Sequence, residues 1–436
     1  MSKLEKYTTY KDSGVEWLGE IPEHWKLEKL KSYCSAFGRI GFRGYNTSDL
    51  VDKGEGSITI SPSNIYEYSM TFEKCTFLSW KKYYESPEIQ IYNDDILIVK
   101  TGSTYGKVGM VKNLPQEATI NPQLLVLKNI TINQRFFFYL MTSSEIQTQV
   151  QKQVIGSTIP TISESKILNF ISFLPPKEEQ TKIASFLDEK TSQIDNAISK
   201  KEKLIELLKE RRQITINEAV TKGLDKDVEF KESGVEWIGA IPKHWEIRKL
   251  GTSLKPISIK NRADLPLLSV TREQSVILRD VEDKDSNHNF IPDDLSGYKM
   301  VEKGQFAMNK MKAWQGSYGI SDYTGIVSPA YYIFELNGIE PSFFHKAIRS
   351  KVYVPFFTKA SDGVRIGQWD LSKSRMKEVP FYIPPKDEQI KIVEYIETQT
   401  AKIDKAIELQ QNYIAKLKEY KASLIDSVVT GKVRVA

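Results

Sequence analysis

The sequence predicts two mixed α/β domains separated by two long coiled-coil helices, because its 436 residues contain one plan twice. Residues 13–25, SGVEWLGEIPEHW, return at 233–245 as SGVEWIGAIPKHW. Residues 174–180, LPPKEEQ, return at 383–389 as IPPKDEQ. An internal repeat of this kind indicates an architecture built from two copies of one unit. The length is also more than one small core requires, which favours two or more domains.

The repeat divides the chain into six segments. They are a Trp-rich entry over 1–25, a first body over 26–175, a central long helix over 176–223, a second Trp-rich entry over 224–245, a second body over 246–383 and a C-terminal long helix over 384–436. The second helix ends where a third entry would begin, so the plan is circular. We therefore expect the first entry to lie near the end of the second helix, in a pseudo-two-fold molecule with antiparallel helices.

Each Pro-Pro pair predicts the start of a long helix. Proline is tolerated in a first helical turn, and the acidic residues that follow favour the positive end of the helix dipole. Gly223 and Gly431 are the expected C-terminal stops. Apolar residues then recur at steps of three and four, the spacing of a coiled-coil seam with Lys201 and Gln410 at equivalent polar positions. The predicted seam is Ile194, Ala197, Leu204, Leu208, Ile403, Ala406, Tyr413, Leu417, Tyr420 and Leu424.

The two bodies share a plan although their sequences match poorly. Residues 96–99 and 124–127 are predicted to be buried strands, and residues 136–141 and 343–348 helices at matching places. We therefore expect two mixed α/β domains with the same fold and different surface residues.

Composition excludes several classes of protein. Two cysteines and four histidines at scattered spacing argue against a disulfide scaffold and against a metal site. No apolar run is long enough to span a bilayer, and the first residues have no signal-peptide pattern. The expected class is a soluble, cytoplasmic protein with a modest net charge of +5.

Enzyme motifs are mostly missing. Residues 102–107, GSTYGK, are one residue short of a phosphate-binding loop, and Val108 stands where a Mg²⁺-binding hydroxyl belongs. The Pro-Pro sites lack the flanking residues of the catalytic tetrapeptide of amino-methyltransferases. His24 and His244 have no second ligand or base nearby, which favours packing or capping. The sequence predicts no catalytic residue, no metal and no cofactor bound by this chain.

Polar loops in both bodies favour nucleic-acid recognition instead. Residues 309–319, NKMKAWQGSYG, and residues 100–107, KTGSTYGK, occupy equivalent positions in the repeat. Lysine and glutamine can reach phosphates or base edges, and glycine lets the backbone approach a phosphate. A solvated hairpin explains any single residue equally well, so the matching positions of the loops favour recognition. The DNA-binding candidates are Arg39, Arg43, Lys100, Ser103, Thr104, Tyr105, Lys107, Lys260, Arg262, Arg272, Lys310, Lys312, Trp314, Gln315, Tyr318, Arg365 and Gln368.

The paired SGVEW(L/I)GxIPxHW entries, the paired (L/I)PPKxEQ helix starts with Ile-Asp downstream and the dissimilar bodies together resemble the DNA-specificity subunits of type I restriction–modification systems. The resemblance covers essentially the whole chain. It implies that residues 26–175 and 246–383 are target-recognition domains that each bind one half of a split, asymmetric DNA site. The helices would then act as a ruler across an unread spacer.

The resemblance also implies partners and cofactors. Such subunits bind double-stranded DNA and two methyltransferase (modification) subunits, and they recruit restriction/translocase subunits. S-adenosylmethionine, ATP and Mg²⁺ are therefore expected in the partner subunits, and the repeated segments of this chain are expected to serve identical partners. Trp17, Trp25, Trp237 and Trp245 are expected to pack body against helix.

Other functions remain open. A modification-only or solitary specificity subunit fits the same residues. A coiled-coil scaffold for two non-DNA domains fits less well, and it would be supported by failure to bind DNA alone or in complex. A divergent nuclease or methyltransferase would show metal- or cofactor-dependent activity as the purified chain.

Overall fold

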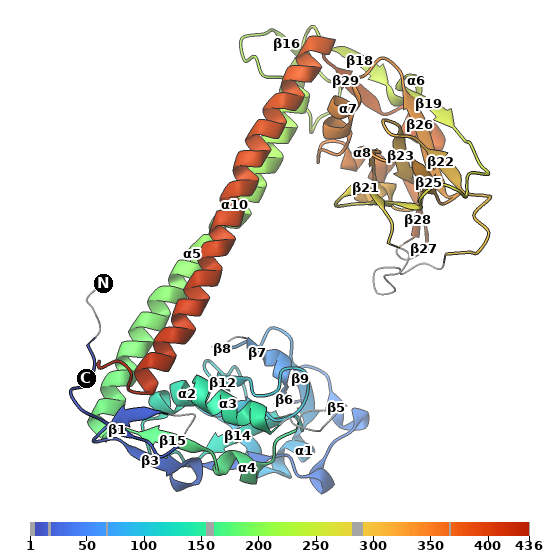
Figure 1. The fold of residues 1–436 in the computed structure, drawn as a ribbon. Helices are drawn as coiled ribbons and strands as arrows, with labels where there is room; N and C mark the ends of the chain where they lie inside the picture. The colour runs from blue at the N-terminus through green and yellow to red at the C-terminus, as the bar shows by residue number, and fades with distance from the viewer. Residues whose placement is uncertain are drawn as a thin grey trace. The chain divides into compact units, whose positions relative to one another are not determined.

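The chain folds into two compact units, residues 1–200 with 413–436 (unit 1) and residues 201–412 (unit 2), which are described separately (Figure 1). Each unit contains one mixed α/β domain and one part of each long helix, so the predicted fold class is confirmed. The computed structural model describes residues 5–15, 19–66, 69–153, 161–280, 291–365 and 368–435.

The two long helices are α5 (Lys177–Lys222) and α10 (Lys386–Val429), and each begins directly after a Pro-Pro pair. Gly223 and Gly431 follow them with φ of +71° and +75°, the left-handed conformation that ends many helices. Both glycines also lie against a Trp-rich entry. A Cβ atom at Gly223 would lie 3.3 Å from the Trp245 ring, and one at Gly431 would lie 3.2 Å from the Trp25 ring. Any larger residue would therefore push the entry away from the helix end.

Within each unit, α5 and α10 run antiparallel and bury one seam with steps of four and three residues. On α5 the seam is Leu187, Thr191, Ile194, Ile198, Lys201, Ile205, Leu208, Arg212, Thr215 and Ala219. On α10 it is Ile396, Thr400, Ile403, Ile407, Gln410, Ile414, Leu417, Lys421, Leu424 and Val428. Every member of the first set lies 209 positions before its counterpart in the second, so the seam repeats with the motifs.

This seam corrects the predicted one at alternate positions. The observed members are Ile198, Ile205, Ile407, Ile414 and Lys421, each one position after a predicted member. Ile198, Ile205 and Lys421 are buried, and the other two are half-buried. The residues that the prediction placed there instead are Ala197, Leu204, Ala406, Tyr413 and Tyr420. Of these, Leu204 is 41% exposed and Tyr413 is 46% exposed. Four of the five observed residues are isoleucines, so the two stripes differ by one position in phase and not by a lower hydrophobicity of the observed seam.

Polar contacts between the helices fix the register of the seam. In unit 2, Lys201 Nζ donates to Gln410 Oε1 at 2.9 Å, and Arg212 Nε lies 3.2 Å from Asp404 Oδ1. In unit 1, Lys421 Nζ donates to Asp195 Oδ1 at 2.7 Å, which is the repeat-equivalent of the Arg212 pair. A slipped register would separate these charges, and burying an unpaired cation is costly.

Each domain contains its own four-stranded antiparallel sheet, and the strand order is equivalent in the two domains. This order is β12-β11-β14-β4 in unit 1 and β24-β23-β26-β19 in unit 2. The unit 1 strands are β4 (Ser35–Gly38), β11 (Ile96–Val99), β12 (Val108–Met110) and β14 (Leu124–Lys128). The unit 2 strands are β19 (Leu254–Ile257), β23 (Phe306–Asn309), β24 (Tyr318–Ile320) and β26 (Tyr331–Leu336). The helices α2 (Gln134–Thr142) and α7 (Pro341–Ile348) follow at matching places, as predicted.

The remaining elements differ more between the domains. Unit 1 adds a second, five-stranded sheet of order β10-β13-β6-β9-β5, whereas the described part of unit 2 adds pairs of strands. The further elements of unit 1 are β1 (Tyr10–Asp12), β2 (Glu20–Pro22), β3 (Lys26–Lys29), β5 (Leu50–Val51), β6 (Gly56–Ile60), β7 (Ile65–Tyr66), β8 (Ser69–Met70), β9 (Thr76–Ser79), α1 (Trp80–Tyr84), β10 (Gln90–Ile91), β13 (Ala118–Ile120), α3 (Ser144–Lys152), α4 (Glu164–Leu168) and β15 (Ile171–Leu174). Those of unit 2 are β16 (Phe230–Glu232), β17 (Ala240–Pro242), β18 (Glu246–Lys249), α6 (Leu250–Ser253), β20 (Leu268–Thr271), β21 (Ser275–Leu278), β22 (Lys299–Val301), β25 (Gly325–Val327), α8 (Val354–Lys359), β27 (Ser361–Arg365), β28 (Gln368–Leu371), α9 (Lys373–Lys377) and β29 (Pro380–Ile383).

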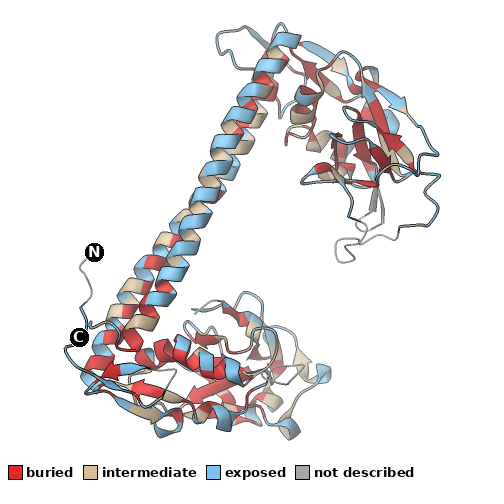
Figure 2. Ribbon diagram, in the orientation of Figure 1, coloured by how far each residue is buried: buried red, intermediate tan, exposed pale blue. Residues whose placement is uncertain are grey.

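In each domain, the strand that directly precedes the long helix pairs with the strand that directly follows the Trp-rich entry. β3 pairs antiparallel with β15, and β18 pairs antiparallel with β29. The core of each domain continues onto the helices, since one buried cluster contains both Trp25 and Val428 and another contains both Trp245 and Val220. Buried segments are seen in the domains and at the adjoining parts of the long helices (Figure 2). The first entry therefore lies at the end of α10, where Arg434 N also donates to Glu5 O at 2.7 Å. Among the helices of the described ranges, none is long and apolar enough to cross a membrane.

Seam substitutions can distinguish the observed phase from the predicted one. We expect Ile205→Ala to lower the free energy of unfolding by about 2–4 kcal/mol, because it removes a buried side chain. Leu204→Ala, one position away and exposed, should change it by less than about 0.5 kcal/mol. Urea unfolding followed by circular dichroism measures both. A larger loss for Leu204→Ala than for Ile205→Ala would contradict the observed seam.

Candidate nucleic-acid interface

Each Trp-rich entry is tied to a long helix by the glutamate of the Pro-Pro motif. His24 Nε2 lies 2.8 Å from Glu179 Oε2, and His244 Nε2 lies 2.8 Å from Glu388 Oε2. The other carboxylate oxygen differs between the copies. In unit 1, Glu179 Oε1 accepts a hydrogen bond from the Tyr7 hydroxyl. In unit 2, Glu388 Oε1 accepts a hydrogen bond from Trp245 Nε1 at 3.1 Å. Burial, and then the Glu179 carboxylate, raise the pKa of Tyr7 above its ordinary value.

The glutamine beside that glutamate ties the helix to the domain. Gln180 Nε2 donates to the Pro175 carbonyl at 2.8 Å, while its Oε1 accepts from the Asn133 backbone N–H at 2.9 Å. Gln389 makes both contacts again, with the carbonyl of the first proline of its motif at 2.8 Å and with the Glu340 N–H at 2.9 Å. Both glutamines are buried, at 3% and 2% exposure. Each therefore joins its helix start to the cap residue of α2 or α7.

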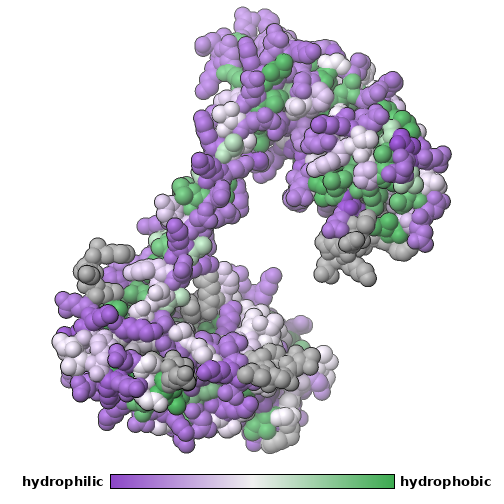
Figure 3. Space-filling view, viewed as in Figure 1, coloured by the Kyte–Doolittle hydropathy of each residue, from purple (hydrophilic) through white to green (hydrophobic). Residues whose placement is uncertain are grey.

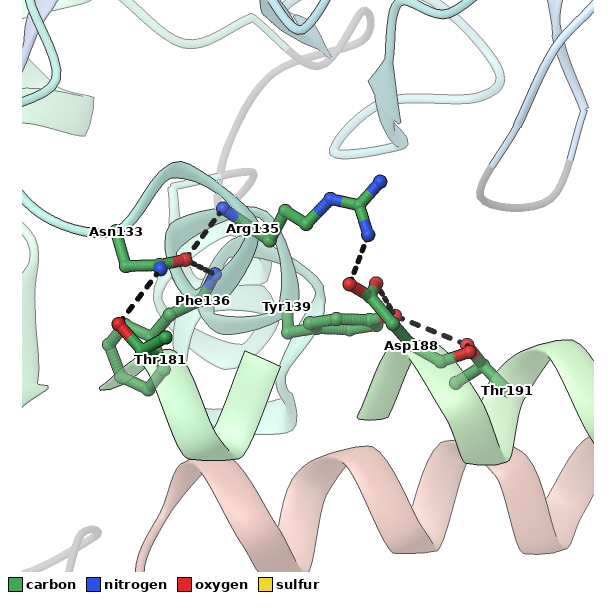
Figure 4. Close-up of polar contacts among 7 residues, drawn as sticks. All are labelled: Asn133, Arg135, Phe136, Tyr139, Thr181, Asp188 and Thr191. Atoms are coloured by element: carbon green, nitrogen blue, oxygen red, sulfur yellow. Dashed lines mark hydrogen bonds and ion pairs between the residues drawn. The ribbon is translucent and has the colours of Figure 1, made fainter. Parts of the chain in front are cut away.

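A second row of contacts lies further along α5 (Figure 4). Asp188 of α5 accepts a hydrogen bond from the Tyr139 hydroxyl at 2.8 Å and forms an ion pair with Arg135. Tyr139 and Arg135 belong to α2. In unit 2, Lys346 of α7 lies 3.4 Å from Glu397, which stands 209 positions after Asp188. We call the glutamine contacts and this second row the joint. One joint is built in each unit from repeat-equivalent positions.

Several DNA-binding candidates of the first body form hydrogen bonds or ion pairs within the domain. Arg39 is 5% exposed, donates to the Ile120 carbonyl at 3.1 Å and to Thr119 Oγ1 at 2.9 Å, and has a pKa lowered by burial. Arg43 pairs with Glu88 at 3.3 Å. Tyr105 donates to the Val150 carbonyl at 3.1 Å, and Lys107 donates to the Ile65 carbonyl. Arg39 is therefore corrected as a DNA contact, because it is buried. Arg43, Tyr105 and Lys107 are partly exposed and stay predictions.

The rest of the first loop keeps polar groups at the surface. Ser103 and Thr104 are exposed and Lys100 is half-buried. The base of the loop is fixed, since Lys100 N donates to the Gln123 carbonyl at 2.8 Å and Ile162 N donates to the Lys100 carbonyl at 3.0 Å. These three candidates therefore lie on a loop whose backbone is fixed by hydrogen bonds, while the side chains of Ser103 and Thr104 are exposed.

The second loop separates into a core part and a surface part. Tyr318 is fully buried with its ring centroid 4.6 Å from that of Phe357, so its assignment as a DNA contact is corrected. Burial raises the pKa of its hydroxyl above the ordinary value. Trp314 stacks on Trp369 with centroids 5.3 Å apart, and Gln315 is half-buried beside it.

The basic candidates of the second body are mostly at the surface. Lys260, Arg262, Arg272 and Lys312 are exposed, and Lys310 Nζ lies 3.4 Å from Asp370. The guanidinium of Arg262 forms two hydrogen bonds with the exposed carboxylate of Asp264, at 2.9 and 2.8 Å.

Four further predicted positions lie in the β27–β28 hairpin and in the Trp-rich entries. The backbones of Arg365 and Gln368 pair in the β27–β28 hairpin, while their side chains lie outside the described part of the structure. Trp17 lies outside the described residues altogether. Trp237 packs on α8, with its ring centroid 4.8 Å from that of Phe356.

Sequence reasoning missed Arg349, which follows α7 and links two of the candidate loops. Its Nη1 donates to the Tyr318 carbonyl at 2.6 Å and to that of Gly316 at 3.4 Å, and its Nη2 donates to the carbonyls of Arg272 and Glu273 at 2.8 and 3.0 Å. Burial lowers the pKa of its guanidinium. The structure thereby places the β20–β21 turn beside the 309–319 loop. No local sequence signal marks this residue, because all its acceptors are main-chain carbonyls.

The contacts of Gln180 predict that its replacement lowers the free energy of unfolding and loosens the backbone near the joint. Gln180→Ala leaves a buried N–H and a buried carbonyl without partners, so we expect a loss of about 1–3 kcal/mol in the free energy of unfolding. Hydrogen exchange at Asn133 should accelerate more than at amides of the β11–β14 sheet. Gln193→Ala, an exposed glutamine on the same helix, serves as the control and should do neither. Equal effects of the two variants would count against the joint.

Arg349→Met should loosen both loops that it links. We expect faster hydrogen exchange over residues 272–275 and 316–320 and a stability loss of about 2–3 kcal/mol, because hydrogen bonds from a charged donor are lost. Lys351→Met removes an exposed cation two residues away and is the matched control. Unchanged exchange in either loop would show that Arg349 does not link them.

The described residues contain no group of three or more His, Cys, Asp or Glu side chains that could hold a metal ion. A family model described as the type I restriction modification DNA specificity domain matches residues 51–209. A putative type I restriction enzyme MjaX specificity subunit from Methanocaldococcus jannaschii is 23% identical over 430 residues, which cover 96% of each chain.

Solved structures agree at the level of the fold. The HsdS subunit from Thermoanaerobacter tengcongensis has a TM-score of 0.50 at 16% identity, covering 95% of this chain and 98% of that one. A chain from work on complex assembly and conformational transition of the type I R-M system has a TM-score of 0.63 at 15% identity, covering 94% and 98%. In its repeated motifs, in the family model over residues 51–209 and in its fold, this chain is similar to the DNA-specificity subunits of type I restriction–modification systems.

Proposed function

We propose that this chain binds a split, asymmetric double-stranded DNA site and directs adenine methylation or restriction by partner subunits. One half-site would be bound by residues 26–175 and the other by residues 246–383. The observation that carries the proposal is the joint, which is built twice from equivalent residues while the loops of the domains differ. Asn133–Gln180 and Glu340–Gln389 are the same backbone contact, at 2.9 Å in both units.

Equivalent joints with different loops suit a protein that attaches two different binding surfaces to its long helices by the same contacts. The loop at 100–107 offers Lys100, Ser103 and Thr104, whereas the loop at 309–319 offers Lys312 and Gln315. Hydroxyls, lysines and amides contact phosphates and base edges with different geometries. Two such loops on equivalent supports would therefore bind two different base sequences, which makes the whole site asymmetric.

The chain itself would carry no catalytic group. His24 and His244, the histidines of the repeated motif, each pair with the glutamate of a helix start and so belong to the structural frame. S-adenosylmethionine would be used by the methyltransferase subunits, and ATP and Mg²⁺ by the restriction subunits. The role of this chain would be to bring those subunits to one DNA sequence.

Apolar side chains outside the seam support a protein partner along the long helices. Leu204 and Leu207 on α5, and Leu409 and Tyr413 on α10, are 41–51% exposed. Figure 3 shows apolar side chains emerging among hydrophilic ones on this part of the surface. Exposed apolar groups gathered on one element favour a protein interface. Because Leu204 and Tyr413 are repeat-equivalent, they fit two copies of one partner, as two methyltransferase subunits would be.

Methylation mapping tests the proposal. The chain is expressed with and without its neighbouring methyltransferase subunit in a host free of adenine methylation, and methyladenine is mapped across the genome. We expect a split, asymmetric motif that is methylated only when both are present. A stable complex without any motif would indicate a scaffold, and methylation by this chain alone would overturn the proposal.

A further inference from the structure

Four lysines from separate segments of unit 2 lie near one another, two of them over the Tyr332 ring, and we call them the lysine cluster: Lys260, Lys299, Lys310 and Lys373. Lys299 opens β22, Lys310 follows β23 and Lys373 opens α9. Nζ of Lys299 lies 6.0 Å from the centroid of the Tyr332 ring, and Nζ of Lys373 lies 5.7 Å from it. Two cations thus share one aromatic ring.

Main-chain contacts hold the cluster together. Met300 N donates to the Ile259 carbonyl at 2.8 Å, which places the segment of Lys260 along β22. Leu371 N donates to the Lys310 carbonyl at 3.2 Å, which brings the segment that leads into α9 against the 309–319 loop. Lys299 Nζ itself donates to the Tyr331 carbonyl at 2.7 Å. The lysines are therefore neighbours because of the fold and not because of side-chain flexibility.

The positive charge of the cluster is poorly compensated. Burial, and then the charges of Lys260, Lys373 and Lys310, lower the pKa of Lys299. Among the described residues, Asp370 is the only acidic group within ion-pair distance of any member, at 3.4 Å from Lys310 Nζ. Like charges at close range repel one another, so this arrangement costs stability in the absence of an anion. An anionic ligand would remove that cost.

The chemistry favours a phosphate over a base edge. Lysine ammonium groups are compact point charges on flexible stems, and they lack the planar fork with which arginine recognises guanine. Lys310 also belongs to the 309–319 loop, whose Gln315 and Lys312 are candidates for the second half-site. Phosphate contacts typically position a protein beside the bases that it recognises.

We propose that the lysine cluster binds the phosphate backbone of DNA beside the second half-site, an inference that rests on the proposed function. Lys299 and Lys373 are new to this surface. They open a strand and a helix instead of lying in a polar loop, so their sequence neighbourhood gave no signal.

The salt dependence of DNA binding tests the cluster. The complex of this chain with its methyltransferase partner is titrated against a labelled duplex that carries the mapped motif, between 50 and 200 mM NaCl. The test variant is Lys299→Met/Lys373→Met, and the control is Lys303→Met/Lys351→Met, which removes two exposed lysines of the same domain. Each lost phosphate contact lowers the slope of log K against log salt by about 0.9, so we expect a change of about 1.8 for the test variant only. Its affinity at 100 mM salt should fall by roughly tenfold per lysine.

Three further readouts decide the outcome. The melting temperature of the test variant should hold or rise, because repulsion around Tyr332 is relieved, so weaker binding would not reflect unfolding. The methylated motif should keep its sequence. A changed motif would assign these lysines to base edges, and an unchanged salt slope would remove them from the interface; either result overturns the proposal. Failure of the unsubstituted complex to bind any duplex would instead overturn the proposed function, and the cluster's role with it.

Discussion

Two buried glutamines carry the organisation of this protein. Gln180 and Gln389 each accept a backbone N–H from a domain helix and donate to a proline carbonyl at the start of a long helix. A buried amide left unpaired costs about 1–3 kcal/mol, so neither side of the contact can shift without loss. The orientation of each recognition domain on its helix follows from this constraint, as do the positions of the loops that the domain presents.

The same logic extends along the helices. A seam made only of Ile and Leu would tolerate a shift by one heptad, whereas Lys201, Arg212 and Lys421 each require a particular partner on the other helix. These polar residues weaken the seam as an apolar surface and strengthen its register. Polar residues at single seam positions typically specify the register of a coiled coil at a cost in stability.

The sequence could predict what the repeat encodes locally. Pro-Pro starts, glycine stops, two bodies of one fold and the family resemblance follow from residues close in sequence. The phase of the seam did not, because Arg212 and Lys421 look like surface residues until their partners Asp404 and Asp195 are known. Arg39 and Tyr318 resemble DNA contacts in a list of residue types, yet tertiary packing buries both. Contacts made to main-chain carbonyls, such as those of Arg349, leave no trace in residue type at the accepting positions.

The joint has a consequence for how such proteins acquire new targets. The glutamine contacts the main-chain amide of the cap residue, and the cap residue itself is Asn133 in one domain and Glu340 in the other. The backbone contact is therefore the same with either side chain, although Asn133 Nδ2 also donates to Thr181 Oγ1 of α5 at 3.3 Å. A foreign domain with a helix start in the same place could be exchanged into either socket by recombination within the repeated segments. Under the proposed function, half-sites would then be exchanged as whole domains while the repeated segments stay unchanged.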